Sequence, residues 1–182
     1  PHYHTLQGYV SAGMEEVKSA DKVFMNANEN PFELPGLEGL NRYPEPQSRA
    51  LLQGYAKLYG VGENQIIMTR GADEAIMILS KLFCEPGQDA ILIHPPTFGI
   101  YQVYAGTLPT KIVEVPLIKK SGTYELDVEG LIAAAKNKSN NIKMLYICSP
   151  NNPTGNSFLH EEILKICKDV EGHSAVILDE TY

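Results

Sequence analysis

The stretch SPNNPTG at residues 149–155 carries residue types that hold a ligand through a fixed amide. It follows the apolar run KMLYIC, so it begins where a strand is expected to end. Pro153 fixes the backbone and Gly155 allows a tight turn, which would hold the Asn152 amide ready to donate to an oxygen. The same residue types also build turns that bind nothing, so both interpretations stay open.

A second chemical group follows the apolar run AVIL, where Asp179 begins the motif DETY. A carboxylate at the end of a buried strand is costly unless a partner compensates it. A cationic group on a ligand would do so, and so would a backbone amide or an arginine from elsewhere in the chain. The residues alone leave these alternatives open.

The motif RGADE at residues 70–74 offers a site for an anion. A glycine before a helix start leaves free backbone N–H groups at Gly71, Ala72 and Asp73, and the helix dipole adds to their attraction for negative charge. Alternatively, the carboxylates of Asp73 and Glu74 only complement their own helix end. An anion site requires these two carboxylates to point away from it.

The motif HPPTFGIY at residues 94–101 places aromatic side chains after another strand. One of Phe98, Tyr101 and Tyr104 would be able to cover the flat face of a heteroaromatic ring. The alternative is ordinary packing beneath a loop, because most aromatic side chains belong to the core.

Alternating strands and helices are predicted to position these motifs. Apolar strands are expected over residues 65–69, 89–93, 111–117, 143–149 and 175–180. Amphipathic helices are expected over 47–59, 71–87 (stopped by Pro86 and Gly87), 128–135 and 160–170. The alternation predicts an α/β fold, a three-layer sandwich with a mostly parallel sheet covered on both faces. Ligands bind such sheets at the carboxyl ends of the strands, where the four motifs lie. Residues 1–46 are expected to form an N-terminal arm, and residues 47–182 the first part of a large ligand-binding domain.

Composition and missing motifs exclude several classes of function. The net charge is −7 and the chain has three arginines, which argues against a nucleic-acid or membrane surface. With no CxxC pair, apolar span or signal peptide, a cytoplasmic setting is expected. The sequence has no GxGxxG motif, no GKS or GKT loop and no nucleophile elbow. This argues against dinucleotide binding, NTP hydrolysis and serine-hydrolase chemistry. The histidines, including HYH near the N-terminus, lack the spacing of a metal site.

The four motifs together describe one ligand, pyridoxal 5'-phosphate. Backbone amides at a helix start would hold its phosphate, an aromatic side chain would cover its pyridine ring, and an amide would reach the ring hydroxyl oxygen. A carboxylate opposite the ring nitrogen would keep that nitrogen protonated, which lets the ring withdraw electrons from a bound amino acid. The sequence therefore predicts this cofactor.

The sequence resembles the histidinol-phosphate aminotransferases, a family of fold-type-I (aspartate-aminotransferase-like) enzymes that use this cofactor. The resemblance covers essentially all 182 residues and rests on NANENP, NRYPEPQ, RGADEAI, FCEPGQDAIL, PPTFGIY, CSPNNPTG and VILDETY. NNPTG and Asp-x-x-Tyr occur in many aminotransferases, whereas NRYPE, GADE and CEPG-DAIL together narrow the resemblance to this family. It implies an aspartate-aminotransferase-like large domain, of which the chain contains only the first part.

The resemblance implies cofactor-binding roles for eight residues: Gly71, Ala72, Asp73, Phe98, Asn152, Asp179, Tyr182 and Tyr43. The first three would bind the phosphate through backbone amides, and Phe98 would stack on the pyridine ring. Asn152 and Tyr182 would hydrogen-bond the ring hydroxyl oxygen, while Asp179 would pair with the ring nitrogen. Asp179 and Tyr182 are the implied catalytic residues. Tyr43 would reach the cofactor phosphate of the neighbouring subunit in a homodimer.

Three further residues are implied in substrate binding. Tyr9 would close over the substrate, and Asn28 and Glu29 would lie near it. The implied reaction converts histidinol phosphate and 2-oxoglutarate to imidazole-acetol phosphate and glutamate in histidine biosynthesis. An aromatic-amino-acid aminotransferase, a threonine-phosphate decarboxylase and a non-catalytic fragment remain as alternatives.

The chain departs from the family pattern in two ways. Phe98 stands where the family usually has tyrosine, so stacking is kept and a hydroxyl is lost. The family's lysine that forms a Schiff base with the cofactor lies in a Ser-Lys pair after Asp-x-x-Tyr, and this chain ends at Tyr182. Its one Ser-Lys pair, Ser80-Lys81, lies inside a predicted helix and lacks that context. We therefore expect a longer natural chain, which supplies the lysine and covers an otherwise exposed apolar sheet edge.

Overall fold

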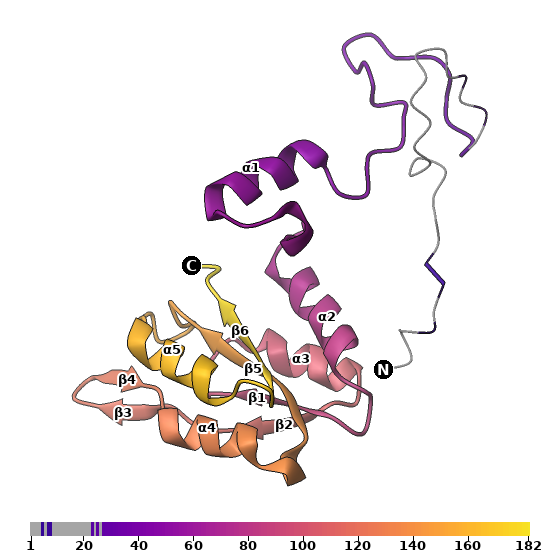
Figure 1. Cartoon of the computed structure of the whole chain (residues 1–182). Helices are drawn as coiled ribbons and strands as arrows, with labels where there is room; N and C mark the ends of the chain where they lie inside the picture. Colours follow the sequence, from indigo (N-terminus) through magenta and orange to yellow (C-terminus); the bar gives the residue numbers. More distant parts are fainter. Residues whose placement is uncertain (1–4, 6, 9–22, 24, 26) are drawn as a thin grey trace. The chain divides into compact units, whose positions relative to one another are not determined.

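The computed structural model describes residues 5, 7, 8, 23, 25 and 27–182, so the predicted substrate residue Tyr9 lies outside the described residues. The described residues form two compact units, one within residues 5–68 and one within residues 69–182. Every strand of the described residues belongs to the larger unit, together with the helices from α2 to α5 (Figure 1).

Among its described residues, the smaller unit has the amphipathic helix α1 (Arg49–Tyr59) and a 3-10 turn, η3 (Glu63–Gln65). α1 ends at Gly60, whose φ of 67° lies in the left-handed region that glycine adopts without strain. Residues 27–46 contain turns and bends and no helix or strand.

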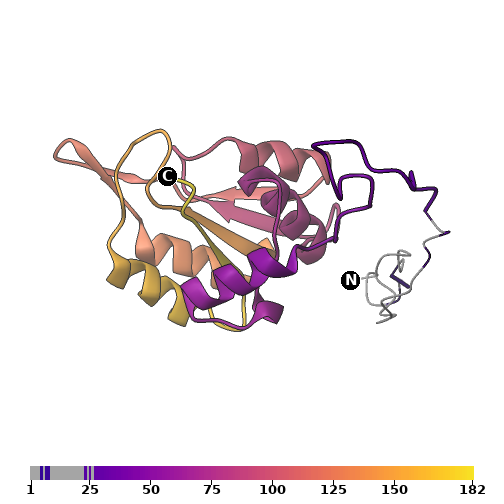
Figure 2. The same ribbon diagram turned by 90° about the horizontal axis from the view of Figure 1, so that it is seen from above.

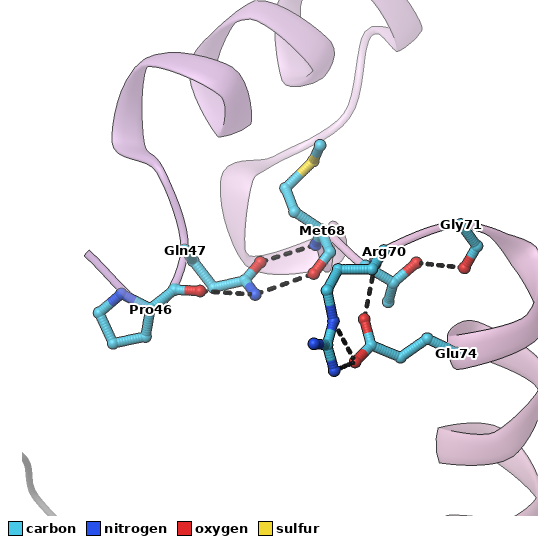
Figure 3. A network of polar contacts seen from close by, with 7 residues as sticks. Pro46, Gln47, Met68, Arg70, Gly71 and Glu74 are labelled. Carbon is cyan, nitrogen blue, oxygen red and sulfur yellow. Dashed lines mark hydrogen bonds and ion pairs between the residues drawn. The ribbon is translucent and has the colours of Figure 1, made fainter. Parts of the chain in front are cut away.

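The prediction of a strand over residues 65–69 is wrong. In the described part of the chain, no strand pairs with this segment. The side-chain amide of Gln47 bonds to both backbone groups of Met68 instead (Figure 3). Met68 N–H donates to Gln47 Oε1 at 2.6 Å, and Gln47 Nε2 donates to the Met68 carbonyl at 3.0 Å. An apolar run becomes a strand only where a neighbouring strand supplies its hydrogen bonds, and here a side chain supplies them.

The larger unit is built around a four-stranded parallel sheet in the order β2-β1-β5-β6. The strands are β1 (Ala90–Ile93), β2 (Lys111–Glu114), β5 (Ile142–Cys148) and β6 (Ala175–Asp179). β6 lies at one edge of the sheet, and its residue Leu178 is 39% exposed. The register pairs Cys148 with Asp179, so β5 and β6 end side by side.

Two helices cover each face of the sheet (Figures 1 and 2). On one face lie α2 (Ala72–Phe83) and α3 (Ile100–Thr107), and on the other α4 (Val128–Lys136) and α5 (His160–Asp169). A second 3-10 turn, η4 (Lys138–Asn140), follows α4.

The side chains of β5 alternate between these two layers. Met144 and Tyr146 pack in the cluster with α2 and α3, whereas Leu145 and Ile147 pack in the cluster with α4 and α5. This period of two is expected for a strand buried on both faces. The predicted three-layer α/β sandwich with a mostly parallel sheet is confirmed.

Two short elements are absent from the sequence predictions. The first is α3, and the second is an antiparallel hairpin of β3 (Ile118–Lys120) and β4 (Thr123–Glu125). Three-residue strands and an eight-residue helix after two prolines are too short to show a hydrophobic period.

The helix start predicted at Asp127 is confirmed, since its Oδ1 accepts from the Gly130 N–H at 2.9 Å. Asp127→Ala is expected to lower the free energy of unfolding by about 1 kcal/mol, because one N–H of the first turn loses its acceptor. Asp127→Asn keeps an acceptor of the same shape and serves as the control. Urea denaturation measures both variants, and equal losses would contradict a role for this hydrogen bond.

Candidate functional site

The carboxyl ends of β5 and β6 bring predicted site residues together. Ser149 N–H, directly after β5, donates to the Asp179 carbonyl at 2.9 Å. The loop after β5 carries Asn152, whose side-chain amide donates to Tyr182 Oη at 2.8 Å. Tyr182 is 63% exposed, so this pair faces solvent. An amide and a phenol that lie far apart in the sequence therefore meet at one end of the sheet.

Asp179 is 9% exposed, and three hydrogen bonds from within the chain reach its carboxylate. Tyr101 Oη donates to Oδ2 at 2.6 Å. The backbone N–H and the hydroxyl of Thr181 donate to Oδ1 at 3.1 and 2.6 Å. None of these three donors carries a positive charge. They hold the carboxylate in place without neutralising it.

The hydroxyl that binds Asp179 comes from a core residue of α3. Tyr101 is 1% exposed, and its ring stacks on that of Tyr146 with centroids 4.5 Å apart. Burial and the hydrogen bond to Asp179 both raise the pKa of Tyr101, so the hydroxyl keeps its proton and stays a donor at neutral pH. Tyr101 is therefore a packing residue of the core and does not cover a ligand ring.

Phe98 lies in the loop between β1 and α3 and is half-buried. Its ring meets that of Tyr101 at 88°, with centroids 5.8 Å apart. Tyr104 packs at the margin of the same cluster. Tyr101 is enclosed in the core, whereas Phe98 and Tyr104 are both partly exposed, and of these two Phe98 lies in the loop directly after β1.

The first turn of α2 begins at Gly71, whose φ of 93° and ψ of 174° suit glycine. No side chain caps this helix start. The Glu74 carboxylate is bound by Arg70 instead, accepting from its N–H at 2.6 Å and from its guanidinium at 2.8 and 3.1 Å (Figure 3). These hydrogen bonds lower the pKa of Glu74. The leading N–H groups, at Ala72 and Asp73, lack intrahelical acceptors and can bind an anion.

Three residues predicted for the cofactor or the substrate lie in the smaller unit. Glu29 Oε1 accepts from the Tyr43 N–H at 2.6 Å, and Oε2 accepts from the Arg42 guanidinium at 3.0 Å. The hydrogen bonds from Tyr43 and Arg42 lower the pKa of Glu29. Asn28 has a left-handed backbone with a φ of 52° and is exposed. The hydrogen bond to Glu29 fixes the backbone of Tyr43, while Tyr43 itself is 71% exposed.

His94 directly follows β1 and is fully buried. Its Nε2 accepts from the Cys148 N–H at 3.2 Å, and its ring meets Phe158 edge-on with centroids 5.3 Å apart. Burial lowers the pKa of His94 to about 4, so the imidazole is neutral and carries its proton on Nδ1. Nδ1 has no hydrogen-bond partner among the described residues. The side chain ties the end of β1 to the end of β5.

Acidification is expected to destabilise the protein through His94. The unfolded chain binds a proton at the ordinary histidine pKa of 6.5, whereas the folded protein resists it until about pH 4. Stability is therefore full above pH 6.5 and falls between pH 6.5 and 4, by about 3 kcal/mol for this residue. Urea denaturation of the wild type and His94→Gln between pH 4 and 8 measures the difference. The same pH dependence in both proteins would contradict a buried neutral histidine.

The sequence predictions gave no site role to His94 and Asn151, and they considered Tyr101 only as an aromatic that would cover a ring. His94, Tyr101 and Asn151 are buried polar residues beside the strand ends, 0%, 1% and 2% exposed. The sequence does contain a signal that could have singled out each residue. They stand in or next to runs that predict burial, and buried polar groups need hydrogen-bond partners. Which partner each one finds depends on how the loops pack.

The described residues contain no helix long and apolar enough to cross a membrane. Over the same residues, no three His, Cys, Asp or Glu side chains gather as metal ligands would. Cys84 and Cys148 are buried free thiols, and Cys167 is an exposed one.

The sequence matches known aminotransferases over most of its length. The family described as aminotransferase class I and II matches residues 20–182. The chain is 43% identical over 180 residues to the histidinol-phosphate aminotransferase of Buchnera aphidicola subsp. Schizaphis graminum, covering 97% of this chain and 48% of that protein. It is 39% identical over 180 residues to that of Vibrio parahaemolyticus, covering 97% and 49%. The chain thus spans about half the length of the curated relatives it matches.

The fold is shared with solved structures of similar enzymes. Cystalysin from Treponema denticola, whose structure contains a pyridoxal 5'-phosphate cofactor, matches 76% of this chain and 36% of its own, with a TM-score of 0.67 and 27% identity. N-succinyldiaminopimelate aminotransferase from Mycobacterium tuberculosis matches 79% of this chain and 39% of its own, with a TM-score of 0.67 and 29% identity. The likeness confirms the predicted fold type and an incomplete large domain.

Proposed function

Since the chain belongs to the aminotransferases of class I and II, we propose that it forms the first part of the pyridoxal 5'-phosphate-binding domain of a histidinol-phosphate aminotransferase. The reaction transfers the amino group of histidinol phosphate to 2-oxoglutarate and yields imidazole-acetol phosphate and glutamate, in histidine biosynthesis. The names of the relatives favour this substrate over an aromatic amino acid or threonine phosphate. The observation that carries the proposal is the Asp179 carboxylate, held by neutral donors at the end of β6.

The residues at this end of the sheet suit the cofactor in charge and shape. Asp179 offers a carboxylate whose three hydrogen-bond donors among the described residues are uncharged, which suits a protonated ring nitrogen. The Asn152–Tyr182 pair offers an amide and a phenol to the ring hydroxyl oxygen, and Phe98 offers an aromatic face. The uncapped start of α2 suits the phosphate, which we assign to Gly71, Ala72 and Asp73.

When bound, pyridoxal phosphate supplies a ring that withdraws electrons from the substrate. Asp179 holds a proton at the ring nitrogen, and Tyr101 and Thr181 keep its carboxylate oriented. Asn152 and Tyr182 fix the ring through its hydroxyl oxygen, with Tyr182 as the second catalytic residue.

The lysine that binds the cofactor covalently is not assigned within these residues. Lys81 lies in the last turn of α2, which begins at the proposed phosphate site, and its side chain is exposed. The chain spans about half the length of its relatives, and we assign the lysine to the part of the protein that follows Tyr182.

We further propose a cytoplasmic homodimer in which Tyr43 reaches the cofactor phosphate of the neighbouring subunit. Its exposed ring and its backbone bond to Glu29 support this role, because the side chain is positioned and open to contact. Tyr9, Asn28 and Glu29 are assigned to the substrate on the family resemblance.

Reduction of the cofactor complex tests the proposal. The natural protein that contains residues 1–182 is incubated with pyridoxal phosphate, reduced with borohydride and weighed intact. We expect a mass well above 20.1 kDa that carries a phosphopyridoxyl group on a lysine, and turnover of histidinol phosphate with 2-oxoglutarate. A protein of 20.1 kDa without an adduct would refute the enzyme assignment. If the adduct forms but the protein prefers an aromatic amino acid or threonine phosphate as substrate, only the assignment of histidinol phosphate is overturned.

A further inference from the structure

Asn151 precedes the proposed cofactor residue Asn152, yet its own side chain is buried, with 2% exposed. Its Oδ1 accepts from Thr97 Oγ1 at 3.1 Å. Its Nδ2 donates to the Pro96 carbonyl at 3.0 Å and to Thr154 Oγ1 at 2.7 Å. The amide therefore has partners for its oxygen and for both of its hydrogens inside the chain.

The backbone of Asn151 closes the turn that presents Asn152. Its N–H donates to the Asn156 carbonyl at 2.8 Å, and its carbonyl accepts from the Gly155 N–H at 2.7 Å. Gly155 has a φ of 76°, which glycine adopts without strain. Both the main chain and the side chain of Asn151 are thus held.

The side-chain bonds of Asn151 join two loops that are distant in the sequence. Pro96 and Thr97 lie in the loop after β1, immediately before Phe98, and Asn151 lies in the loop after β5. β1 and β5 are neighbours in a parallel sheet, so both loops leave the same end of it. The amide therefore sets the spacing between Phe98 and Asn152.

We propose that Asn151 is a positioning residue for the cofactor, which clamps the loop bearing Phe98 to the loop bearing Asn152. The proposal rests on the proposed function, since it concerns the ring-face and ring-oxygen contacts of that cofactor. Of the side chains this short, only asparagine offers an oxygen acceptor and two N–H donors. Asn151→Asp keeps the shape, loses both donors and places a carboxylate oxygen against the Pro96 carbonyl.

Asn141→Asp provides a matched control. The Asn141 amide also bridges two segments, donating to Asp89 Oδ1 at 2.6 Å and to the Gln88 carbonyl at 3.2 Å. These residues precede β1 and β5, so this bridge lies at the opposite end of the two strands from Asn151. Both substitutions replace an amide bridge by a carboxylate.

The test uses the natural full-length protein and three measurements: the Tm without cofactor, the Kd for pyridoxal phosphate, and the circular dichroism of the bound cofactor in its own absorption band. The dichroism reports how the ring is held and does not depend on turnover. Both variants are expected to lower the Tm, but only Asn151→Asp should weaken binding by about tenfold or more and change the dichroism. Thr97→Val removes one of the three side-chain hydrogen bonds. Its Kd for pyridoxal phosphate and its dichroism should lie between those of Asn151→Asp and the wild type.

The outcomes separate this proposal from the proposed function. A wild type that does not bind pyridoxal phosphate refutes both. If the wild type binds and Asn151→Asp shows the same Kd and dichroism, the residue serves stability alone and the proposal is overturned. An equal loss of binding in Asn141→Asp also overturns it, because general destabilisation then explains the effect. Should Asn151→Asp fail to fold, the Kd and dichroism of Thr97→Val decide in the same way.

Discussion

Asp179→Asn is expected to reduce the proposed turnover of histidinol phosphate by the full-length protein by roughly 10²-fold or more. Asparagine has the same shape and retains an oxygen that can accept from Tyr101 or Thr181. It carries no charge, however, and so cannot hold a proton on the ring nitrogen, on which electron withdrawal by the cofactor depends. Steady-state kinetics measures kcat, and the Tm shows whether the fold is kept.

Asp169→Asn controls for the loss of one negative charge. Asp169 ends α5 and forms an ion pair with Lys165, whose Nζ lies 2.7 Å from its Oδ2. This pair is exposed to solvent, so its loss is expected to change kcat by less than about twofold. Wild-type kcat in Asp179→Asn would remove Asp179 from the catalytic assignment.

Tyr101→Ala is expected to lower the free energy of unfolding by about 3–5 kcal/mol. The substitution removes a buried ring that stacks on Tyr146 and leaves a cavity between α3 and the sheet. Tyr101→Phe keeps the ring and removes only the donor to Asp179, which should cost about 1–3 kcal/mol because Oδ2 stays buried. Urea denaturation of both variants separates packing from hydrogen bonding.

Tyr104→Phe is the matched control for the hydroxyl. Tyr104 lies on the same helix, and its hydroxyl takes no part in the contact between Tyr101 and Asp179. Tyr104→Phe is expected to change the free energy of unfolding by no more than about 0.5 kcal/mol. An equal effect of Tyr101→Phe and Tyr104→Phe would show that the hydrogen bond to Asp179 contributes nothing to stability.

Local patterns in the sequence were enough to predict the class of fold. The continuous apolar runs of β1 and β5, with amphipathic helices between the strands, indicate a parallel sheet covered on both faces, because burial repeats with the period of each element. The start of α4 was also predictable, since Asp127 bonds within its own first turn. The same reasoning was wrong for residues 65–69, where Gln47 takes the place of a partner strand.

Motifs in the sequence also determined which residues to test as a site. Asn152, Asp179 and Tyr182 belong to motifs that follow apolar runs, and the rule that ligands bind at the carboxyl ends of parallel strands applies to them without any structure. The motifs left open which of Phe98, Tyr101 and Tyr104 faces a ligand. Burial in the folded chain encloses Tyr101 and leaves Phe98 partly exposed.

Only the tertiary structure decided which polar groups meet. Tyr101 reaches Asp179, Asn151 reaches Pro96, and His94 reaches the Cys148 N–H, each across more than fifty positions of the chain. Hydropathy periods state which face of an element is buried, but they do not state which strands are neighbours in the sheet. The order β2-β1-β5-β6 and the pairing of Cys148 with Asp179 bring these side chains within hydrogen-bond distance. Residue types and their order along the chain thus came from the sequence, while contacts between distant residues required the packed sheet.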